Sequence, residues 1–391
     1  MIRNISVGID IGTTTTRIVV GEFSKGETYP KVIGVGESET KGMRHGYVTD
    51  VNQAVDSLKK AVAMAEKTSG IKIRRAFIAI GGTTLHGDVS SGEAIITKAD
   101  GEVTNLDINK SIKDGENNLN LNNKKVIQIF PIAFKLDGKE ILGRPEGMRG
   151  TKLETKALFA TSSLSHWEDL LEVVALAGVE PINVVASAVA GSHIALSEKQ
   201  KIVGGAIIDI GSETTKLAVF ENGLLISIRT FQIGGADITN DIALGLKIPL
   251  EKAENFKLES IAAELSKEYS KKKLDEIIEA RLSDIFELIE NHLKKIKRNE
   301  LLPAGVVFVG GSANISHLEE LSKTILKLPS RTGSTDVLGN AKTKLRDPAW
   351  FPVLGLVFAG KNNEGYVEGS FSNMWRDAKN SIKSNLKQLM P

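Results

Sequence analysis

The sequence contains no cysteine, and this absence removes several chemistries at once. Disulfides, zinc sites built from thiolates and a cysteine nucleophile are all excluded. The chain has 6 histidines among 391 residues, and none of them stands at the short spacing of a metal-binding pair. A metal site built from sulfur or imidazole is therefore not expected.

An excess of charge of one sign is also missing. The 50 lysines and arginines nearly balance the 48 aspartates and glutamates, which leaves a net charge of +2. A chain this close to neutral has no overall field that would attract nucleic acid or a membrane. We therefore expect no nucleic-acid partner.

Long hydrophobic runs are absent as well. No stretch approaches the roughly 18 uninterrupted apolar residues that a membrane-spanning helix needs. The N-terminus passes straight into a strand pattern without a signal region. With 41% apolar and 25% charged residues, the composition is that of a globular protein. We expect a cytoplasmic protein of about two or three domains, whose contact with any membrane is peripheral.

What the sequence does contain is an internal repeat. Residues 7–22 read VGIDIGTTTTRIVVGE and residues 206–221 read AIIDIGSETTKLAVFE, with 8 of 16 positions identical when Asp10 is aligned with Asp209. Each copy is a β-branched run, a polar Asp-x-Gly turn and a second β-branched run, which predicts a β-hairpin. Two α/β halves that each begin with this hairpin predict a duplicated fold with a cleft between the halves.

One segment breaks this symmetry. Residues 85–161 have no counterpart in the second half and predict an inserted β-α-β-β subdomain. The charged run 267–273 is expected to be a solvated loop. Apolar periodicity predicts helices over 51–69, 105–119, 166–177, 236–245, 274–298 and 315–326, and strands over 75–80, 87–97, 125–136, 151–161 and 306–309.

The two polar turns have the composition of phosphate-binding loops. A hairpin turn rich in glycine and threonine points several backbone N–H groups into one concavity, which suits phosphate oxygens. Gly12 and Gly211 permit close approach of the backbone, because a Cβ at either position would block the anion. Hydroxyl groups add further donors at Thr13, Thr14, Thr15 and Ser212.

An aspartate precedes each of these turns. Because like charges repel, Asp10 and Asp209 are not expected to bind the phosphate itself. Their expected role is to hold Mg²⁺ through water, and Asp209 is also the candidate for orienting a water molecule toward the last phosphate. An ordinary Asp-Gly turn is the alternative for one copy alone, and the presence of two copies argues against it.

Glycine pairs elsewhere are candidates for the adenosine end of the same cleft. Gly310 and Gly311, followed by Ser312, come after a buried strand and begin a helix, where a base or sugar can lie against bare backbone. A plain strand–helix turn has the same pattern. Gly234 and Gly235 also follow a strand and are candidates for lining the cleft, with a turn as the alternative.

Two charged residues are candidates for binding ribose hydroxyls. Glu254 and Lys257 stand three positions apart and therefore share one helical face, with a surface ion pair as the alternative. The competing nucleotide motifs are absent, since no G-x-x-x-x-G-K-[ST] run and no complete dinucleotide fingerprint occurs. The phosphates are thus expected to be clamped between two hairpins.

Together these motifs resemble the actin/chaperone/sugar-kinase ATPase superfamily and, within it, the FtsA family of bacterial cell-division proteins. The more specific likeness lies in KVIQIFPIAFKLDG…RPEGMRGTKLE (125–154) and in IGGADITNDIALGL (233–246) followed by KAENFK. The resemblance implies an actin-like two-domain ATPase fold with ATP and Mg²⁺ as cofactors. It implies a nucleotide site made of Asp10, Gly12, Thr13, Thr14, Thr15, Arg17, Gly211, Ser212, Glu213, Thr214, Gly234, Gly235, Glu254, Lys257, Gly310, Gly311 and Ser312.

The resemblance also implies a division into subdomains. The insert shows no ligand chemistry of its own, so we expect it to be a surface through which copies associate head to tail into filaments. The expected parts are subdomain 1A (1–84 and 162–195), inserted subdomain 1C (85–161), subdomain 2A (196–230 and 303–360), subdomain 2B (231–302), a linker (361–370) and an amphipathic helix (371–391).

The function that the resemblance implies is that of a scaffold which tethers the tubulin-like division protein FtsZ to the inner face of the cytoplasmic membrane. A pilus-assembly adaptor of the PilM type and a small-molecule kinase on the same fold are the alternatives. One departure concerns catalysis, because Glu213 stands where relatives often have a small residue. A carboxylate there opposes the charge of the terminal phosphate, so we expect at most a slow ATPase.

The end of the chain has the pattern of a helix that lies on a membrane surface. At about 100° per residue, its bulky apolar residues fall on one arc and its cations lie beside that arc. Such a helix binds an anionic leaflet through both sets of residues. The predicted membrane-binding residues are Phe371, Met374, Trp375, Arg376, Lys379, Ile382, Lys383, Leu386, Lys387 and Leu389.

Overall fold

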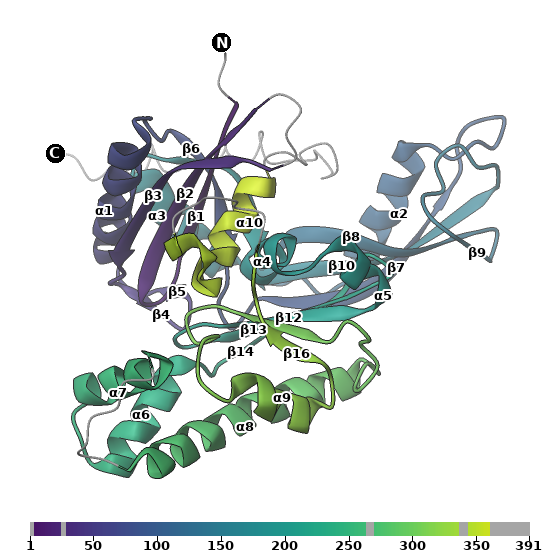
Figure 1. The fold of residues 1–391 in the computed structure, drawn as a ribbon. Coiled ribbons are helices and arrows are strands. Elements are labelled where there is room, and N and C mark those ends of the chain that lie inside the picture. Colours follow the sequence, from purple (N-terminus) through teal and green to yellow (C-terminus); the bar gives the residue numbers. More distant parts are fainter. Residues whose placement is uncertain (1–3, 25–28, 263–269, 336–342, 360–391) are drawn as a thin grey trace.

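Two β-sheets carry the fold of residues 4–24, 29–262, 270–335 and 343–359, which are the part of the chain that the computed structural model describes (Figure 1). The first sheet has the order β11-β6-β1-β2-β3, in which β1, β2 and β3 are antiparallel neighbours and β6 and β11 run parallel. Its strands are β1 (Asn4–Ile11), β2 (Thr15–Phe23), β3 (Lys31–Glu39), β6 (Arg75–Ile80) and β11 (Glu180–Ala186).

The second sheet repeats this order. Its strands β16-β15-β12-β13-β14 have the same parallel and antiparallel neighbours as their counterparts in the first sheet. This match confirms the predicted duplication of an α/β unit that begins with a hairpin. The strands are β12 (Gly205–Ile210), β13 (Thr215–Glu221), β14 (Leu224–Phe231), β15 (Val306–Val309) and β16 (Ser330–Thr332).

The insert extends the second sheet on the side of β14. β7 meets β14 where His86 pairs with Arg229, and the order continues β7-β10-β8-β9. The insert projects from the rest of the molecule and has a core of its own, which includes Phe134, Leu153 and Phe159 (Figure 1). It contains one short strand more than predicted, with β7 (His86–Ile95), α2 (Asn105–Asn117), β8 (Lys124–Leu136), β9 (Lys139–Ile141) and β10 (Lys152–Ser163).

Helices cover both sheets from outside and fill the space between them. Helix α1 shows why the sequence begins and ends a helix where it does, because the Asp50 side chain accepts from the Gln53 N–H and Gly70 ends the helix with φ 69°. The other helices are α3 (Leu164–Leu176), α4 (Ser187–Ala195), α5 (Glu198–Val203), α6 (Gly235–Leu246), α7 (Leu250–Ala262), α8 (Lys271–Lys295), α9 (Leu318–Leu326) and α10 (Phe351–Ala359), besides α1 (Val51–Ser69).

Helices α4 and α10 cross between the two halves. Helix α10 packs on β1 and β2 of the first half, and α4 packs on β12 and β13 of the second. The crossing is close, because a Cβ on Gly355 of α10 would lie 1.8 Å from the Ala190 carbonyl oxygen of α4. One hydrophobic core therefore joins the halves and contains Ile9, Ile207 and α10 residues such as Val353.

Several predicted boundaries were wrong. The charged run 267–273 is not a loop throughout, since Lys271, Lys272 and Lys273 form the first turn of α8. The helix predicted from residue 315 begins at Leu318, because Ser312 to His317 form hydrogen-bonded turns before it. Helix α2 ends at Asn117 and α8 at Lys295, slightly before their predicted ends.

Some predictions fall outside the described residues. The linker 361–370 and the amphipathic helix 371–391, with all of its membrane-binding residues, belong to this part. Among the described residues, no helix has both the length and the apolar character needed to cross a bilayer. Two short strands, β4 (Met43–Arg44) and β5 (Tyr47–Val48), were not predicted and lie next to the hairpin turns considered below.

Candidate functional site

The turn of the first hairpin is closed by its own backbone. The last pair of β1 and β2 is Ile11 with Thr16, and the Gly12 N–H donates to the Thr15 carbonyl at 3.1 Å. A Cβ on Gly12 would lie 2.8 Å from that carbonyl oxygen, so the turn requires glycine. Thr13 and Thr14 form the tip of the turn.

The second hairpin uses the same backbone arrangement with different side chains. The Gly211 N–H donates to the Thr214 carbonyl at 2.9 Å, and a Cβ on Gly211 would lie 3.1 Å from the same oxygen. The tip consists of Ser212 and Glu213. Both predicted phosphate loops are therefore tight, glycine-dependent turns, and they differ in what their tips present.

Lys216 lies between the aspartates that precede the two loops. It is the cross-strand neighbour of Asp209, and its Nζ lies 2.8 Å from Asp209 Oδ2. Burial opposes the charge on Lys216, but the carboxylates of Asp209 and Asp10 outweigh burial and raise the pKa of the lysine. Burial also raises the pKa of Asp10, while Lys216 counteracts this rise and Asp209 adds to it. The three groups form one charge cluster that connects the halves.

The sequence analysis missed Lys216, although the repeat contained the signal. Alignment of the two copies places Lys216 opposite Arg17, which was predicted as a site residue. The two cations make different contacts, because the Nε of Arg17 donates to Glu37 Oε1 at 3.2 Å and its guanidinium lies 5.5 Å from the centre of the Trp350 ring. Arg17 therefore contacts Glu37 on β3 and Trp350, while its charge still acts on its cross-strand neighbour Asp10, whereas Lys216 pairs directly with Asp209.

The N-terminus of α6 rests directly on the second loop. The Gly235 N–H donates to the Gly211 carbonyl at 2.9 Å, and the Ala236 N–H donates to the Ser212 carbonyl at 2.6 Å. A Cβ on Gly234 would lie 2.6 Å from the Ser212 carbonyl oxygen, so this approach requires glycine. The structure thus brings Gly234 and Gly235 against the loop, as the shared cleft requires.

Glu254 and Lys257 form an ion pair on α7, with 2.7 Å between the charged atoms. Lys257 is buried, and its Nζ also donates to the Gly235 carbonyl at 3.1 Å and to Thr239 Oγ1 at 2.9 Å. The lysine end of the pair is buried, whereas 43% of the Glu254 side chain is exposed. The pair ties α7 to the first turn of α6, beside the second loop.

The turn after β15 completes this cluster. Gly310 has φ 93°, and a Cβ there would lie 2.4 Å from Asp209 Oδ1. The Ser312 N–H donates to the Ile210 carbonyl at 3.1 Å. A Cβ on Gly311 would meet no atom within 4 Å, so bare backbone faces open space there. The predicted residues of the second half therefore lie together, and their roles stay predictions.

The unpredicted turn between β4 and β5 contacts both loops. The Gly46 N–H donates to Thr13 Oγ1 at 3.2 Å, and the His45 N–H donates to the Glu213 carboxylate. No repeat and no motif in the sequence marked this turn, because its importance lies in contacts between residues that are far apart in the chain. It links the tip of the first loop to the tip of the second.

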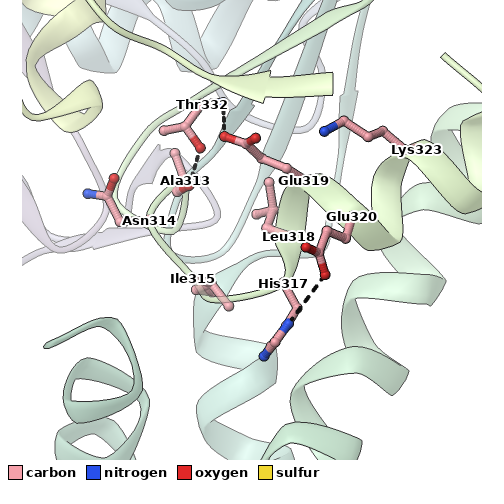
Figure 2. Close-up of a pocket in the computed structure, with 9 residues that line it drawn as sticks. All are labelled: Ala313, Asn314, Ile315, His317, Leu318, Glu319, Glu320, Lys323 and Thr332. Atoms are coloured by element: carbon pink, nitrogen blue, oxygen red, sulfur yellow. Dashed lines mark hydrogen bonds and ion pairs between the residues drawn. The ribbon is translucent and has the colours of Figure 1, made fainter. Parts of the chain in front are cut away.

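A cavity of about 410 Å³ is lined by residues that follow the Gly310–Ser312 turn and by the first residues of α9 (Figure 2). Figure 2 shows Glu319 accepting from Thr332 and Glu320 paired with His317 at the beginning of α9. Neither phosphate loop lines this cavity, so we do not assign the phosphates to it. Its lining residues are Ala313, Asn314, Ile315, His317, Leu318, Glu319, Glu320, Lys323 and Thr332.

The charge cluster sets limits on a metal site. Within the described ranges, no group of three histidine, aspartate or glutamate side chains is arranged to hold a metal ion. Mg²⁺ held through water needs only one or two carboxylates, since that ion keeps several waters and takes other oxygens from phosphates. Asp10 and Asp209 fit this requirement. The N–H groups of Gly12 and Gly211 close their own turns, so the tips of the two loops are what remains to bind phosphate. A Mg²⁺ ion at this place would interact with the same two carboxylates as the Lys216 ammonium does.

Comparison with known families identifies two regions of the chain. Residues 206–355 match the model of the cell division protein FtsA, and residues 82–161 match the SHS2 domain inserted in that protein. The second match covers the insert predicted over 85–161. Three curated relatives, all named cell division protein FtsA, align over most of this chain.

These relatives come from distant bacteria. The protein of Streptococcus pneumoniae serotype 2 (strain D39) is 30% identical over 91% of this chain and 80% of its own length. That of Bacillus subtilis (strain 168) is 28% identical over 91% and 83%. The protein of Borreliella burgdorferi is 27% identical over 99% and 98%.

Solved structures show the same architecture at lower sequence identity. The PilM–PilN type IV pilus biogenesis complex contains a chain that matches with a TM-score of 0.67 at 16% identity, over 91% of this chain and 98% of that one. MreB5 of Spiroplasma citri bound to ADP matches with a TM-score of 0.54 at 15% identity, over 92% and 98%. At these identities the likeness establishes the actin-like fold and nothing further.

Proposed function

This chain belongs to the FtsA family of cell-division proteins, and from that premise we propose that it is an ATP-binding scaffold. We propose that it assembles into filaments on the inner face of the cytoplasmic membrane and tethers the tubulin-like protein FtsZ there. Family membership weakens the pilus-adaptor alternative, because the likeness to the PilM chain is one of fold alone. No observation favours a small-molecule kinase.

The observation that carries ATP binding is the pair of glycine-dependent turns that face one charge cluster. Each turn is closed tightly by the N–H of Gly12 or Gly211, and the backbone of a tight turn of this kind can bind an anion. Lys216 supplies the buried positive charge between them. The structure of MreB5, which shares the fold, was determined with ADP bound, which is consistent with this proposal.

Within this proposal the residues of the cluster have separate roles. The threonine hydroxyls of the first loop and the Ser212 hydroxyl donate to phosphate oxygens, and Asp10 and Asp209 hold Mg²⁺ through water. The Gly310–Ser312 turn and the Glu254–Lys257 pair lie at the adenosine end. Asp209 orients a water molecule for a slow hydrolysis, which Glu213 restrains by its negative charge.

Titration calorimetry with ATP and Mg²⁺ tests the nucleotide site. The wild type is expected to bind, and Gly12→Val is expected to lose binding, because a Cβ at this position would lie 2.8 Å from the Thr15 carbonyl oxygen and distort the loop proposed to hold the phosphate. Thermal melting of both proteins shows whether the variant is folded. Unchanged ATP affinity in folded Gly12→Val would overturn the assignment of the first loop.

The membrane part of the proposal rests on sequence, because residues 371–391 lie outside the described part of the chain. Trp375 stands at the centre of the apolar arc, and each neighbouring cation contributes about 1 kcal/mol near an anionic leaflet. Trp375→Glu is expected to abolish cosedimentation with anionic liposomes and to leave ATP binding unchanged. Added FtsZ is expected to pellet with the liposomes only when the wild-type scaffold is present.

The filament part of the proposal is supported by the tip of the insert. Ile95, Leu106, Leu142 and Met148 are exposed there, with Leu142 fully so at 102%. Exposed apolar side chains on a projecting subdomain favour contact with another copy. Leu142→Asp is expected to reduce filament formation on lipid seen by electron microscopy. Normal filaments from this variant would place the contact elsewhere.

A further inference from the structure

The Glu213 side chain is directed from the second loop to the turn between β4 and β5. Its Oε2 accepts from the His45 N–H and lies 3.8 Å from His45 Nδ1. Glu213 is partly buried, with 25% of its side chain exposed. Among the described residues, no lysine or arginine pairs with it, and the His45 backbone N–H is its hydrogen-bond donor.

The turn that holds this carboxylate has the geometry of an anion site. His45 and Gly46 both have positive φ, 50° and 81°, and consecutive residues of this kind direct successive N–H groups to the same side. The first N–H donates to Glu213 and the next donates to Thr13 Oγ1 at 3.2 Å. The Glu213 carboxylate and the Thr13 hydroxyl at the tip of the first loop therefore accept from the N–H groups of adjacent residues.

The turn is fixed from behind, so it offers these groups in a defined place. The Tyr47 ring lies 4.7 Å from the His166 ring, and the Tyr47 hydroxyl accepts from Thr83 at 3.0 Å. Burial lowers the pKa of His166, whose neutral ring donates from Nε2 to the Gly81 carbonyl at 3.0 Å. A rigid pair of donors binds an anion without further ordering cost.

We propose that Glu213 is an internal anion that occupies the His45 N–H of this turn when no nucleotide is bound, and that the terminal phosphate of a nucleoside triphosphate displaces it. The inference rests on the proposed function, because it requires the phosphates to lie between the two loops. A diphosphate lacks the group that approaches Glu213. The carboxylate therefore opposes ATP more than ADP and sets the preference between them.

The prediction concerns the ratio of the two affinities. Glu213→Gln keeps an oxygen that accepts from His45 but removes the charge, and Glu213→Ala removes both. Two like charges about 4 Å apart interact strongly enough that loss of one is expected to tighten ATP binding at least about tenfold. ADP binding is expected to change less than about threefold. The control Glu140→Gln has the same loss of charge on the exposed strand β9 and is expected to change neither.

Titration calorimetry with ATP and with ADP, both with Mg²⁺, separates the outcomes. A tenfold rise in the preference for ATP in Glu213→Gln or Glu213→Ala, with none in Glu140→Gln, supports the proposal. Wild-type binding with an unchanged or reduced preference in both Glu213 variants overturns it and leaves the ATP site intact. Absence of binding in the wild type overturns the proposed function itself.

Amide hydrogen exchange gives a readout that does not depend on affinity. In the nucleotide-free wild type, the His45 amide is expected to be protected by Glu213, and Glu213→Ala is expected to lose this protection. Thermal melting shows whether each variant is folded. Equal protection of the His45 amide in the wild type and in folded Glu213→Ala would overturn the proposal.

Discussion

The two hairpins have the same backbone arrangement, but the cations that follow their turns have different partners. In each, a glycine N–H closes the turn onto a threonine carbonyl, at 3.1 Å in the first and 2.9 Å in the second. The cation that follows is Arg17 in one copy and Lys216 in the other. Arg17 pairs with Glu37 at the partly exposed edge, whereas Lys216 is enclosed between two aspartates. A duplicated frame thus pairs one cation directly with an aspartate of the cluster and directs the other to Glu37, from where its charge still acts on Asp10.

The crossing helices differ in the same way. Helix α10, which supports the first hairpin, consists of apolar residues and one glycine besides its proline. Helix α4, which supports the second, carries Ser187 and His193, whose Oγ and Nε2 are buried without a hydrogen-bond partner. The helix that supports the second hairpin therefore carries buried polar groups, and the helix that supports the first has only apolar residues, a glycine and a proline.

The largest expected effect is the loss of the enclosed cation. Lys216→Met leaves two aspartates without their counter-charge, and breaking a buried pair in this way costs about 3–5 kcal/mol of the free energy of unfolding. The matched variant Arg17→Met loses only a partly exposed pair and is expected to cost about 1 kcal/mol or less.

Urea unfolding of both variants at pH 7 measures this difference. Equal losses in Lys216→Met and Arg17→Met would break the comparison, because they would mean that the two hairpins bury their cations to the same degree. If Lys216→Met is as stable as the wild type, the charge cluster does not contribute to the stability of the fold.

The next effect concerns the crossing of the two helices. Gly355→Ala places a methyl group 1.8 Å from the Ala190 carbonyl oxygen. Because that oxygen belongs to the backbone, the clash is relieved only if one of the two helices shifts. Overpacking of this kind is expected to cost about 3 kcal/mol. Gly191→Ala places its methyl 3.2 Å from the flexible end of Ile207, so its crowding is mild. There the better helix propensity of alanine, about 1 kcal/mol, offsets the crowding.

Thermal melting of the two glycine variants tests this asymmetry. A fall in Tm for Gly355→Ala and an unchanged Tm for Gly191→Ala are expected. The reverse order would mean that α4, rather than α10, is the helix that needs bare backbone at the crossing.

The sequence predicted the duplicated hairpins, the insert and the grouping of glycines because these features are local patterns or repeats. It did not predict the third strand of each half, such as β14, whose role depends on partners far along the chain. Lys216 was within reach of the repeat alignment. His45 and Gly46 were not, since only tertiary contacts bring their N–H groups to Thr13 and Glu213.

The boundary of α8 teaches the same lesson. A run of three lysines reads as a solvated loop, yet Lys271–Lys273 begins a helix because Leu274 and Ile278 behind it are buried in the second core. Lysine side chains reach solvent equally well from a helix and from an extended loop. Burial of the apolar residues in the following turns therefore decides that the segment is helical.

Acid is expected to act on the second half through α4. Burial, with the nearby Lys201 charge, lowers the pKa of His193 to about 4 from its ordinary 6.5. The unfolded chain takes up the proton near pH 6.5 and the folded chain only near pH 4, so stability is lost as the pH falls through this window. For this partly buried ring we expect a loss of about 2 kcal/mol.

Urea unfolding between pH 7 and pH 4 measures this loss. His193→Leu is expected to flatten the profile, while the control His317→Leu, at an exposed position, leaves it as in the wild type. His166 and His292 also have pKa values that burial lowers, that of His292 to about 4, so both contribute to the remaining slope in both variants. A profile of His193→Leu identical to the wild type would show that α4 does not contribute to the acid response.

The smallest expected effect separates the two aspartates that share one lysine. Burial raises the pKa of Asp10, so its charged form is disfavoured in the folded protein and its stability contribution falls as the pH rises through that raised pKa. Asp10→Asn removes this disfavoured charge and is expected to raise the free energy of unfolding at pH 7 by about 0.5–1 kcal/mol. Asp209→Asn loses the 2.8 Å pair with Lys216 and is expected to lower it. Urea unfolding at pH 7 reads both signs. If both variants are destabilised, Lys216 stabilises the two aspartates alike, and the contrast between the two hairpins does not hold.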